Sequence, residues 1–271
     1  MDEAQRGSRA GGVWNSPLSV ILRHPDTVGL QLDDPLTTER RAGIIAGNSF
    51  LRQIYDEWYT LVAERVPAGP GGVLEIGSGG GFLPRYLPGV ITSEILPCRG
   101  VQAILDARQL PFGSGTLKAI VMVDVLHHIP DVRPFFEDAS RALRPDGVVV
   151  MVEPWVSTWS RFVFSTFHHE PFRPEADSWA FPSSGPLSGA NGALPWMVFQ
   201  RDRESFEATW PGLQVRGVTP MMPFRYLVSG GVSMRQLMPG SLFGTWRAVD
   251  QLFSRWATRW PMFALIELRR S

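Results

Sequence analysis

Apolar residues recur along this chain at two different spacings. Residues 48–66 repeat apolar side chains, Trp58 and Val62 among them, at the three-to-four-residue interval of an amphipathic helix. Asn48 or Ser49 begins this repeat as a candidate N-cap. The helical interval returns in three later segments, which we also expect to be helices: 132–143, 202–210 and 241–260.

Short, continuous apolar runs lie between these segments and are typical of buried strands. We expect strands at 72–76, 90–94, 102–105, 118–123, 148–153, 213–218 and 262–268. Buried apolar strands joined through helices form a mainly parallel sheet that is covered on both faces. The pattern therefore predicts an α/β fold.

The regular pattern stops after residue 153. Residues 154–200 are rich in Trp, His, Pro, Ser and Gly without a sustained period. A loop of that length is usually functional or disordered, and its aromatic content argues against disorder. Its tryptophans either wall an acceptor site beneath a lid or simply fill the core. The tryptophans in question are Trp155, Trp159, Trp179 and Trp196.

Composition narrows the possible functions. The 271 residues include 26 basic and 26 acidic side chains, and a formal net charge of zero argues against a protein that coats nucleic acid. The single cysteine, Cys98, can form neither an internal disulfide nor a zinc site built from cysteines, and we assign no metal ligands. The sequence has no apolar stretch of about 18 residues that would span a membrane. Its start lacks a secretory apolar region, so we expect a cytoplasmic protein.

The strongest chemical signal is the glycine-rich run 75–81 (EIGSGGG), which follows the first predicted strand. Glycines there allow a sharp turn and a close approach of the backbone to a ligand. Position 82 is Phe, so the run fits E-x-G-x-G-x-G better than the dinucleotide fingerprint G-x-G-x-x-G. Glu94, Asp106 and Asp124 end or follow the next three strands. These carboxylates would meet at the carboxyl edge of a parallel sheet, where such folds bind ligands.

Five motifs in order resemble the class I S-adenosylmethionine-dependent methyltransferases. They are VLEIGSGGGF, ITSEI, LDARQLPF, VDVLHHIPD and LRPDGVVVMVEP, and the resemblance covers about residues 48–153. It implies S-adenosyl-L-methionine as the cofactor and S-adenosyl-L-homocysteine as the product. The segment between Gly81 and Glu94 is shorter than usual in the family, so the first crossover helix has at most about two turns.

The resemblance also implies roles for individual residues. Glu75 orients the glycine loop, which lies against the methionine part of the cofactor. Glu94 binds the ribose, Asp106 and Ala107 meet the adenine, and the backbone around Asp124 lies near the sulfonium. The expected cofactor-binding residues are Glu75, Gly77, Ser78, Gly79, Gly81, Glu94, Asp106, Ala107, Asp124 and Val125.

Transfer of a methyl group from a sulfonium is an in-line displacement that needs a base only if the acceptor is a hydroxyl or a similar acid. Histidine is the usual base near neutral pH. His127 would face the acceptor, and His168, His169 and Glu170 form a second candidate group. The alternatives are a hydrogen-bonded histidine at a helix start for His127 and a solvated or structural loop for the second group.

We therefore expect a Rossmann-like, seven-stranded, mainly parallel sheet with an antiparallel last strand and helices on both faces. Residues 1–47 are an N-terminal lead and cap segment, and 48–271 the methyltransferase domain, with insertions at about 154–200 and 220–260 as an acceptor-side lid. The helix at 241–260 packs on its own sheet, contacts a second copy or rests on a membrane.

The expected function is methyl transfer to a small-molecule acceptor, at oxygen or carbon. The alternatives are a non-methylating reaction on the same fold, such as a cyclisation, or a non-catalytic partner subunit. We expect a monomer or homodimer that binds no nucleic acid.

Overall fold

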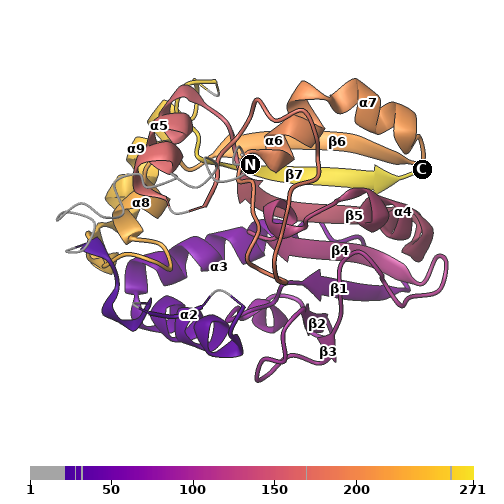
Figure 1. The fold of residues 1–271 in the computed structure, drawn as a ribbon, viewed down its shortest axis with the longest axis horizontal. Helices are drawn as coiled ribbons and strands as arrows, with labels where there is room; N and C mark the ends of the chain where they lie inside the picture. The colour runs from indigo at the N-terminus through magenta and orange to yellow at the C-terminus, as the bar shows by residue number, and fades with distance from the viewer. Residues whose placement is uncertain (1–21, 28, 32, 169, 257) are drawn as a thin grey trace, which may run out of the picture.

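A computed structural model describes residues 22–271 except 28, 32, 169 and 257. The described residues form one seven-stranded sheet in the order β3-β2-β1-β4-β5-β7-β6 (Figure 1). Its strands are β1 (Gly72–Ile76), β2 (Ile91–Glu94), β3 (Ala103–Ile104), β4 (Leu117–Val123), β5 (Leu143–Pro154), β6 (Leu213–Met221) and β7 (Phe263–Arg270). Strand β7 runs antiparallel to both of its neighbours, whereas β1 to β5 pair in parallel. The predicted seven-stranded sheet with an antiparallel last strand is confirmed.

Helices cover both faces of this sheet, as predicted. The α-helices are α2 (Pro35–Gly47), α3 (Ser49–Ala63), α4 (Arg133–Ala142), α5 (Thr158–Phe167), α6 (Leu194–Trp196), α7 (Arg203–Thr209), α8 (Arg225–Ser229) and α9 (Phe243–Phe253). Short 3₁₀ segments are η2 (Pro25–Thr27), η3 (Leu83–Arg85), η4 (Leu126–His128) and η6 (Gly240–Leu242), and η5 (Met197–Arg201) is a π-helix. Within the described part of the chain, no helix is long and apolar enough to cross a membrane.

Alternating side chains of the central strands build one core on each face. Ile120 of β4 packs with α4, α6 and α7 on one side. Val121 of β4 and Val150 of β5 pack with α3 and α5 on the other side. Both faces are apolar because each is covered, which is typical of a parallel sheet.

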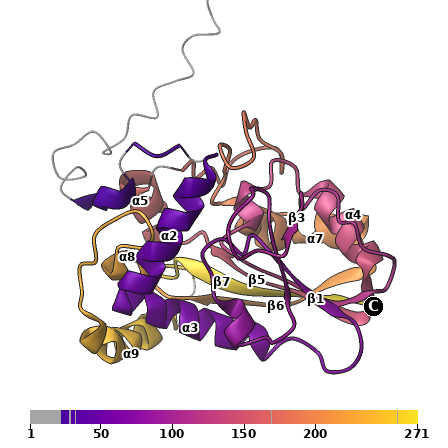
Figure 2. The ribbon, with the colours of Figure 1, turned by 90° about the horizontal axis from the view of Figure 1, so that it is seen from below.

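Helix α3 illustrates how the sequence sets an element. Asn48 is its N-cap, as one of the two predicted alternatives, and its Oδ1 accepts hydrogen bonds from the backbone N–H groups of Phe50 and Leu51. Of the predicted apolar stripe, Ile54, Trp58 and Val62 are fully buried, whereas Leu61 is half-buried. Figure 2 shows α2 and α3 following each other at the same side of the sheet.

The structure differs from the expectation in several elements. Segments for which no regular structure was expected contain the helices α2, α5, α6 and α8 and the π-helix η5. The helix expected over 241–260 begins at Phe243 and ends at Phe253. The first crossover contains the single 3₁₀ turn η3, within the expected limit of about two turns. Helix α5 buries Val163 and Phe164 but exposes Phe162 (53%) beside Arg161. An aromatic residue on the exposed face obscures the apolar period by which a sequence reveals a helix.

The carboxyl ends of the parallel strands define where the site lies. In Figure 1 the arrowheads of β1 and β4 point toward the side of the molecule where α2, α5 and α8 are placed. These three helices come from the N-terminal segment and from the two insertions. They therefore surround the sheet edge at which open α/β folds bind ligands.

Candidate active site

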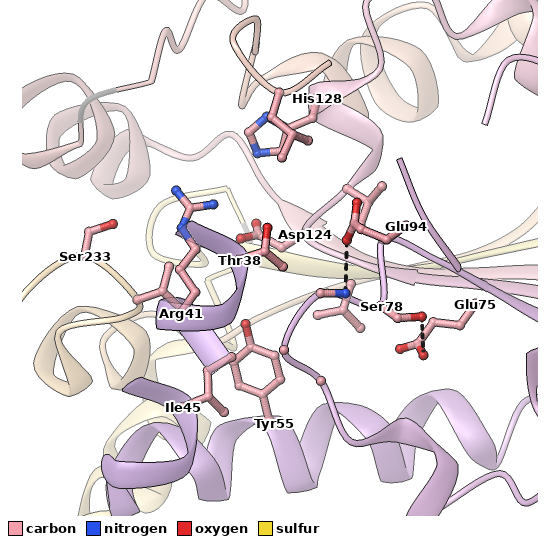
Figure 3. Close-up of a pocket in the computed structure, with 18 of the residues that line it drawn as sticks. Thr38, Arg41, Ile45, Tyr55, Glu75, Ser78, Glu94, Asp124, His128 and Ser233 are labelled. Carbon is pink, nitrogen blue, oxygen red and sulfur yellow. Dashed lines mark hydrogen bonds between the residues drawn. The ribbon is translucent and has the colours of Figure 1, made fainter. Parts of the chain in front are cut away.

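The glycine loop after β1 lines a cavity at this edge (Figure 3). Gly77 has φ +67°, and a Cβ there would lie 2.4 Å from Val125 Cγ2. Gly79 has φ +47°, a backbone angle that residues other than glycine rarely adopt. A Cβ on Gly80 would lie 2.2 Å from the Cα of Ala42 in α2. The loop is thus a backbone cradle in which Gly77 and Gly80 leave no room for a side chain, and α2 packs directly on it.

Two buried glutamates stabilise the cradle. The Ser78 hydroxyl donates a hydrogen bond to Glu75 Oε2 (2.8 Å). Glu94 accepts hydrogen bonds from the backbone N–H groups of Gly79 (3.0 Å) and Ile95 (2.9 Å). Burial raises the pKa of Glu75 to about 7, and burial also raises the pKa of Glu94. Glu94, the residue expected to bind the ribose, therefore connects the end of β2 to the loop.

A second cavity of about 490 Å³ adjoins the first and shares Gly77, Glu94, Val125 and His128 with it. The two residues expected to meet the adenine, Asp106 and Ala107, line this cavity. The Asp106 carboxylate is bound by Arg108 (Nη2–Oδ2, 2.7 Å), and these hydrogen bonds lower the pKa of Asp106.

A loop from the first insertion forms another wall of the second cavity, with Leu187 shared between both cavities. The Leu187 N–H donates a hydrogen bond to Asp33 Oδ1 (2.6 Å), just before α2. This contact joins the insertion to the N-terminal segment over the cradle.

Helix α2 contributes residues that the sequence analysis missed. Thr38, Arg41 and Ile45 line the first cavity. The Arg41 side chain points into it in Figure 3, and no ion pair of Arg41 occurs among the described residues. The signal that could have revealed this helix is Asp34-Pro35, an N-cap followed by proline at the first helical position. A cation is thus placed beside the glycine cradle.

Asp124 ends β4 at the floor of the first cavity. Its φ of +63° is in the left-handed region, which aspartate tolerates better than most residues. Burial raises the pKa of Asp124 to about 6. The following N–H groups of Val125 and Leu126 donate hydrogen bonds to Glu153 Oε1 (2.9 and 2.7 Å). Val125 therefore lines the cavity without a free backbone donor.

The two histidines of η4 have different surroundings. His127 is 1% exposed, and its Nδ1 lies 2.8 Å from Glu153 Oε2, while its Nε2 lies 3.5 Å from Glu170 Oε2. Burial alone would lower the pKa of His127, but the hydrogen bonds to Glu153 and Glu170 raise it well above its usual value. His128 lines both the first and the second cavity, whereas His127 lines neither. Burial and the neighbouring His127 lower the pKa of His128 to about 3.

The second candidate group is only partly described. Glu170 and His168 line the first cavity, whereas His169 lies outside the described residues. The Glu170 carboxylate has Oε1 3.7 Å from His128 Nε2 and Oε2 3.8 Å from His168 Nδ1. Burial alone would raise the pKa of Glu170, but the surrounding histidines hold it well below its usual range. The structure thus brings His127, His168 and Glu170 together, and adds His128.

The tryptophans of the first insertion belong to the core. Trp155 and Trp179 are buried among the side chains beneath α4 and α7. Trp159 donates a hydrogen bond from Nε1 to the Pro223 carbonyl (2.9 Å). None of these three, nor Trp196, lines either cavity at the cradle. Of the two interpretations of these tryptophans, core packing is the one that the geometry favours.

An apolar cavity opens beside the first one, between α5 and α8. It shares His168, Tyr226, Val232 and Ser233 with the first cavity. Its remaining walls are Val163, Phe164, Phe167, Leu227, Gly230, Gly231, Met234 and Met262. The ionisable side chains at the end of β4 are therefore bordered on one side by an apolar space.

Comparisons with known proteins agree with this geometry. Residues 74–151 match the family model described as a methyltransferase domain. The structure of geranyl diphosphate C-methyltransferase from Streptomyces coelicolor A3(2), solved with Mg²⁺, geranyl diphosphate and S-adenosyl-L-homocysteine, is 11% identical, with a TM-score of 0.50. That match covers 92% of this chain and 89% of the other. The cyclase SpnF is 16% identical over 79% of this chain and 81% of its own, with a TM-score of 0.45. No curated protein sequence matches the chain significantly.

The sheet order, the cradle and the family match together define a class. The chain carries a methyltransferase domain of the class I, S-adenosylmethionine-dependent type, and S-adenosylmethionine is its cofactor. At 11% identity the likeness to the geranyl diphosphate enzyme shows a shared fold.

Proposed function

We propose that this protein transfers a methyl group from S-adenosylmethionine to a small-molecule acceptor, at oxygen or carbon. One observation carries the proposal: the glycine cradle and the partly buried ionisable side chains Asp124, His128 and Glu170 line a single cavity. Chemistry at a sulfonium needs the acceptor to be aligned beside the cofactor and away from water. A cavity that joins both groups supports that arrangement.

The cofactor roles follow the two adjoining cavities. The cradle has room for the methionine part of the cofactor, whose ammonium would lie toward Glu75 and whose carboxylate would lie toward Arg41. Glu94 borders both cavities, as a ligand of the ribose would need to. Ala107 and Asp106 border the second cavity, where the adenine would be bound.

The proton chemistry centres on Asp124. When bound, the cofactor supplies an electrophilic methyl group on a positively charged sulfur. With a pKa near 6, the Asp124 carboxylate is ionised at neutral pH and basic enough to accept a proton from an acceptor hydroxyl. Among the residues expected to act in catalysis, Glu170 and His168 line the cavity in which the acceptor would bind. His127 is held by its contact with Glu153 and would position Glu170, 3.5 Å away.

The acceptor is proposed to have two unlike parts. The ionisable cluster suits a hydroxyl or an acidic carbon, and the adjoining space between α5 and α8 suits an apolar group. We keep the expectation of a cytoplasmic monomer or homodimer without a nucleic-acid partner, in line with the zero net charge.

The test uses S-adenosylmethionine that carries an isotopic label in its methyl group, and a small-molecule extract from the producing cells. We expect a labelled product by mass spectrometry with the wild-type protein. The substitution Asp124→Asn should lower product formation by about 10²-fold or more, the usual scale for loss of a proton acceptor. Its affinity for S-adenosylhomocysteine should stay unchanged.

Asp146→Asn is the matched control, because Asp146 has the same φ of +63° but is exposed near the start of β5, away from the cavities. It should leave product formation unchanged. If the product is instead an unlabelled isomer of the acceptor, the protein catalyses a cyclisation-type reaction and not methyl transfer. Failure to bind S-adenosylhomocysteine at micromolar concentration would point to a non-catalytic partner subunit.

A further inference from the structure

Three side chains from two segments converge on one point beside the acceptor cavity. His127 and His128 come from η4, and Glu170 comes from the first insertion. One ligand atom of each lies within 4.8 Å of the others. We propose that His127 Nε2, His128 Nε2 and Glu170 bind a first-row divalent metal ion of the zinc type. The sequence alone did not predict this site, because Glu170 lies 42 residues from His128.

His127 has the environment of a metal ligand. Its Nδ1 lies 2.8 Å from Glu153 Oε2, and a carboxylate oxygen accepts a hydrogen bond, so Nδ1 is the donor. In the neutral ring Nε2 then presents its lone pair, and it lies 3.5 Å from Glu170 Oε2. A carboxylate behind a histidine that ligates metal is the usual arrangement for fixing the tautomer and orientation of the ring.

His128 repeats the same orientation. Its Nδ1 lies 3.4 Å from the Gly189 carbonyl, which can only accept a hydrogen bond. The lone pair of Nε2 therefore faces Glu170 Oε1 at 3.7 Å. A proton on Nε2 of His127 would let that atom donate a hydrogen bond to Glu170. The contact of His128 with Glu170 would still bring the Nε2 lone pair against a carboxylate oxygen. One cation among the three groups satisfies both contacts.

The distances fit such a cation. Zinc–nitrogen and zinc–oxygen bonds of about 2.0–2.2 Å place neighbouring ligand atoms of a tetrahedral site roughly 3.4 Å apart. The separations of 3.5 and 3.7 Å involve the two different oxygens of Glu170, and one ligand atom of each residue lies within 4.8 Å of the others. Side-chain movements of about 1 Å would therefore bring the three ligand atoms to the spacing of a tetrahedral site. Two imidazoles and a carboxylate favour a metal of zinc type over the oxygen-preferring Mg²⁺.

The site also has an open side. His128 and Glu170 line the first cavity, and Asp124 Oδ1 lies 3.9 Å from His127 Nε2. Three protein ligands with a remaining position toward a cavity are typical of a catalytic zinc site. The role of the ion rests on the proposed function: it would bind the acceptor oxygen and lower the pKa of its hydroxyl, and Asp124 would take the proton. The binding of the ion itself does not depend on that function.

The experiment measures metal binding by the full-length, tag-free protein. After equilibrium dialysis against Zn²⁺, and separately against Co²⁺, we expect about one bound ion per chain and a visible absorption of the Co²⁺ complex. His128→Gln and Glu170→Gln each remove one ligand and should weaken binding by more than about tenfold. His24→Gln is the control, since His24 lies in a surface segment near Asp26.

Far-UV circular dichroism and urea unfolding, measured in parallel, show that each variant is folded. The proposal is overturned if the wild type binds no ion beyond what both ligand variants retain, with the fold of all three proteins intact. It is also overturned if His24→Gln removes the bound ion. Failure of the proposed function would appear separately, as absent product with the ion still bound.

Discussion

At the scale of single residues, a buried carboxyl group shapes the pH dependence of the protein. Burial raises the pKa of Glu75 from 4.5 to about 7, so the folded state binds its proton more tightly than the unfolded chain does. The stabilising contribution of that proton is fully present below pH 4.5 and is lost as the pH rises through 7. The apo protein should therefore lose stability over this interval.

The substitution Glu75→Gln removes this titration and keeps an acceptor for the Ser78 hydroxyl. The free energy of unfolding of the variant relative to wild type should rise by up to about 3 kcal/mol between about pH 5 and about pH 8, since each pKa unit corresponds to about 1.36 kcal/mol. Urea unfolding at both pH values checks this. Glu137→Gln, on the exposed face of α4, serves as the control. A pH-independent difference for Glu75→Gln would contradict the expectation.

The residues whose place in the fold could be predicted lie next to regular backbone. Glu94 and the loop glycines could be placed because the turn after a strand fixes their positions. For the histidines of η4, the sequence analysis expected His127 to face the acceptor, whereas one 3₁₀ turn encloses the His127 ring beside Glu153 and turns His128 toward the cavity. Arg41 was missed for another reason, because its helix was not recognised.

At the scale of elements, the packing of α2 on the glycine loop controls the cofactor site. Gly80→Ala places a Cβ against the backbone of Ala42, so α2 must move away from the cradle. We expect a loss of about 1–3 kcal/mol in stability, as in overpacked cores, and a weaker affinity for S-adenosylhomocysteine. Calorimetric titration and urea unfolding measure the two effects.

Gly43→Ala is the matched substitution on the same helix, because a Cβ at Gly43 meets nothing within 4 Å. It should stabilise the protein by roughly 0.5–1 kcal/mol through the higher helix propensity of alanine and leave cofactor affinity unchanged. Equal losses of affinity in both variants would show that α2 acts through its stability and not through its contact with the loop.

Most strands and the long helix α3 could be predicted because their periods are clean and their ends are marked. Helix α5 could not, although Ser157 and Ser160 form a capping box, since the aromatic residues that follow obscure its faces. The contact between the first insertion and the N-terminal segment could not be predicted either, because Asp33 and Leu187 are 154 residues apart in the sequence. Long-range contacts of this kind leave no local pattern.

At the scale of the whole molecule, the division at residue 48 can be tested by truncation. Residues 48–271 contain the sheet and most of both cores, whereas α2 adds the buried Ile44 and Ile45. The truncated chain should therefore still unfold cooperatively in urea. Its affinity for S-adenosylhomocysteine should fall by about tenfold or more, because Thr38 and Arg41 are lost from the cavity.

If the truncated chain binds S-adenosylhomocysteine as tightly as the full-length chain, α2 does not contribute to the cofactor site. A chain that no longer folds would show that the N-terminal segment is part of the domain. The two results are separated by circular dichroism before any binding is measured.

The hydrogen bond from Leu187 to Asp33 has a kinetic consequence. Two segments that lie far apart in the sequence meet above the cradle through this bond, and both line cavities in which the cofactor is proposed to lie. If exchange of product for fresh cofactor requires them to part, closure over the reactants and reopening place opposite demands on one contact, as in many enzymes whose turnover is limited by product release. The strength of this hydrogen bond would then set the rate of successive turnovers.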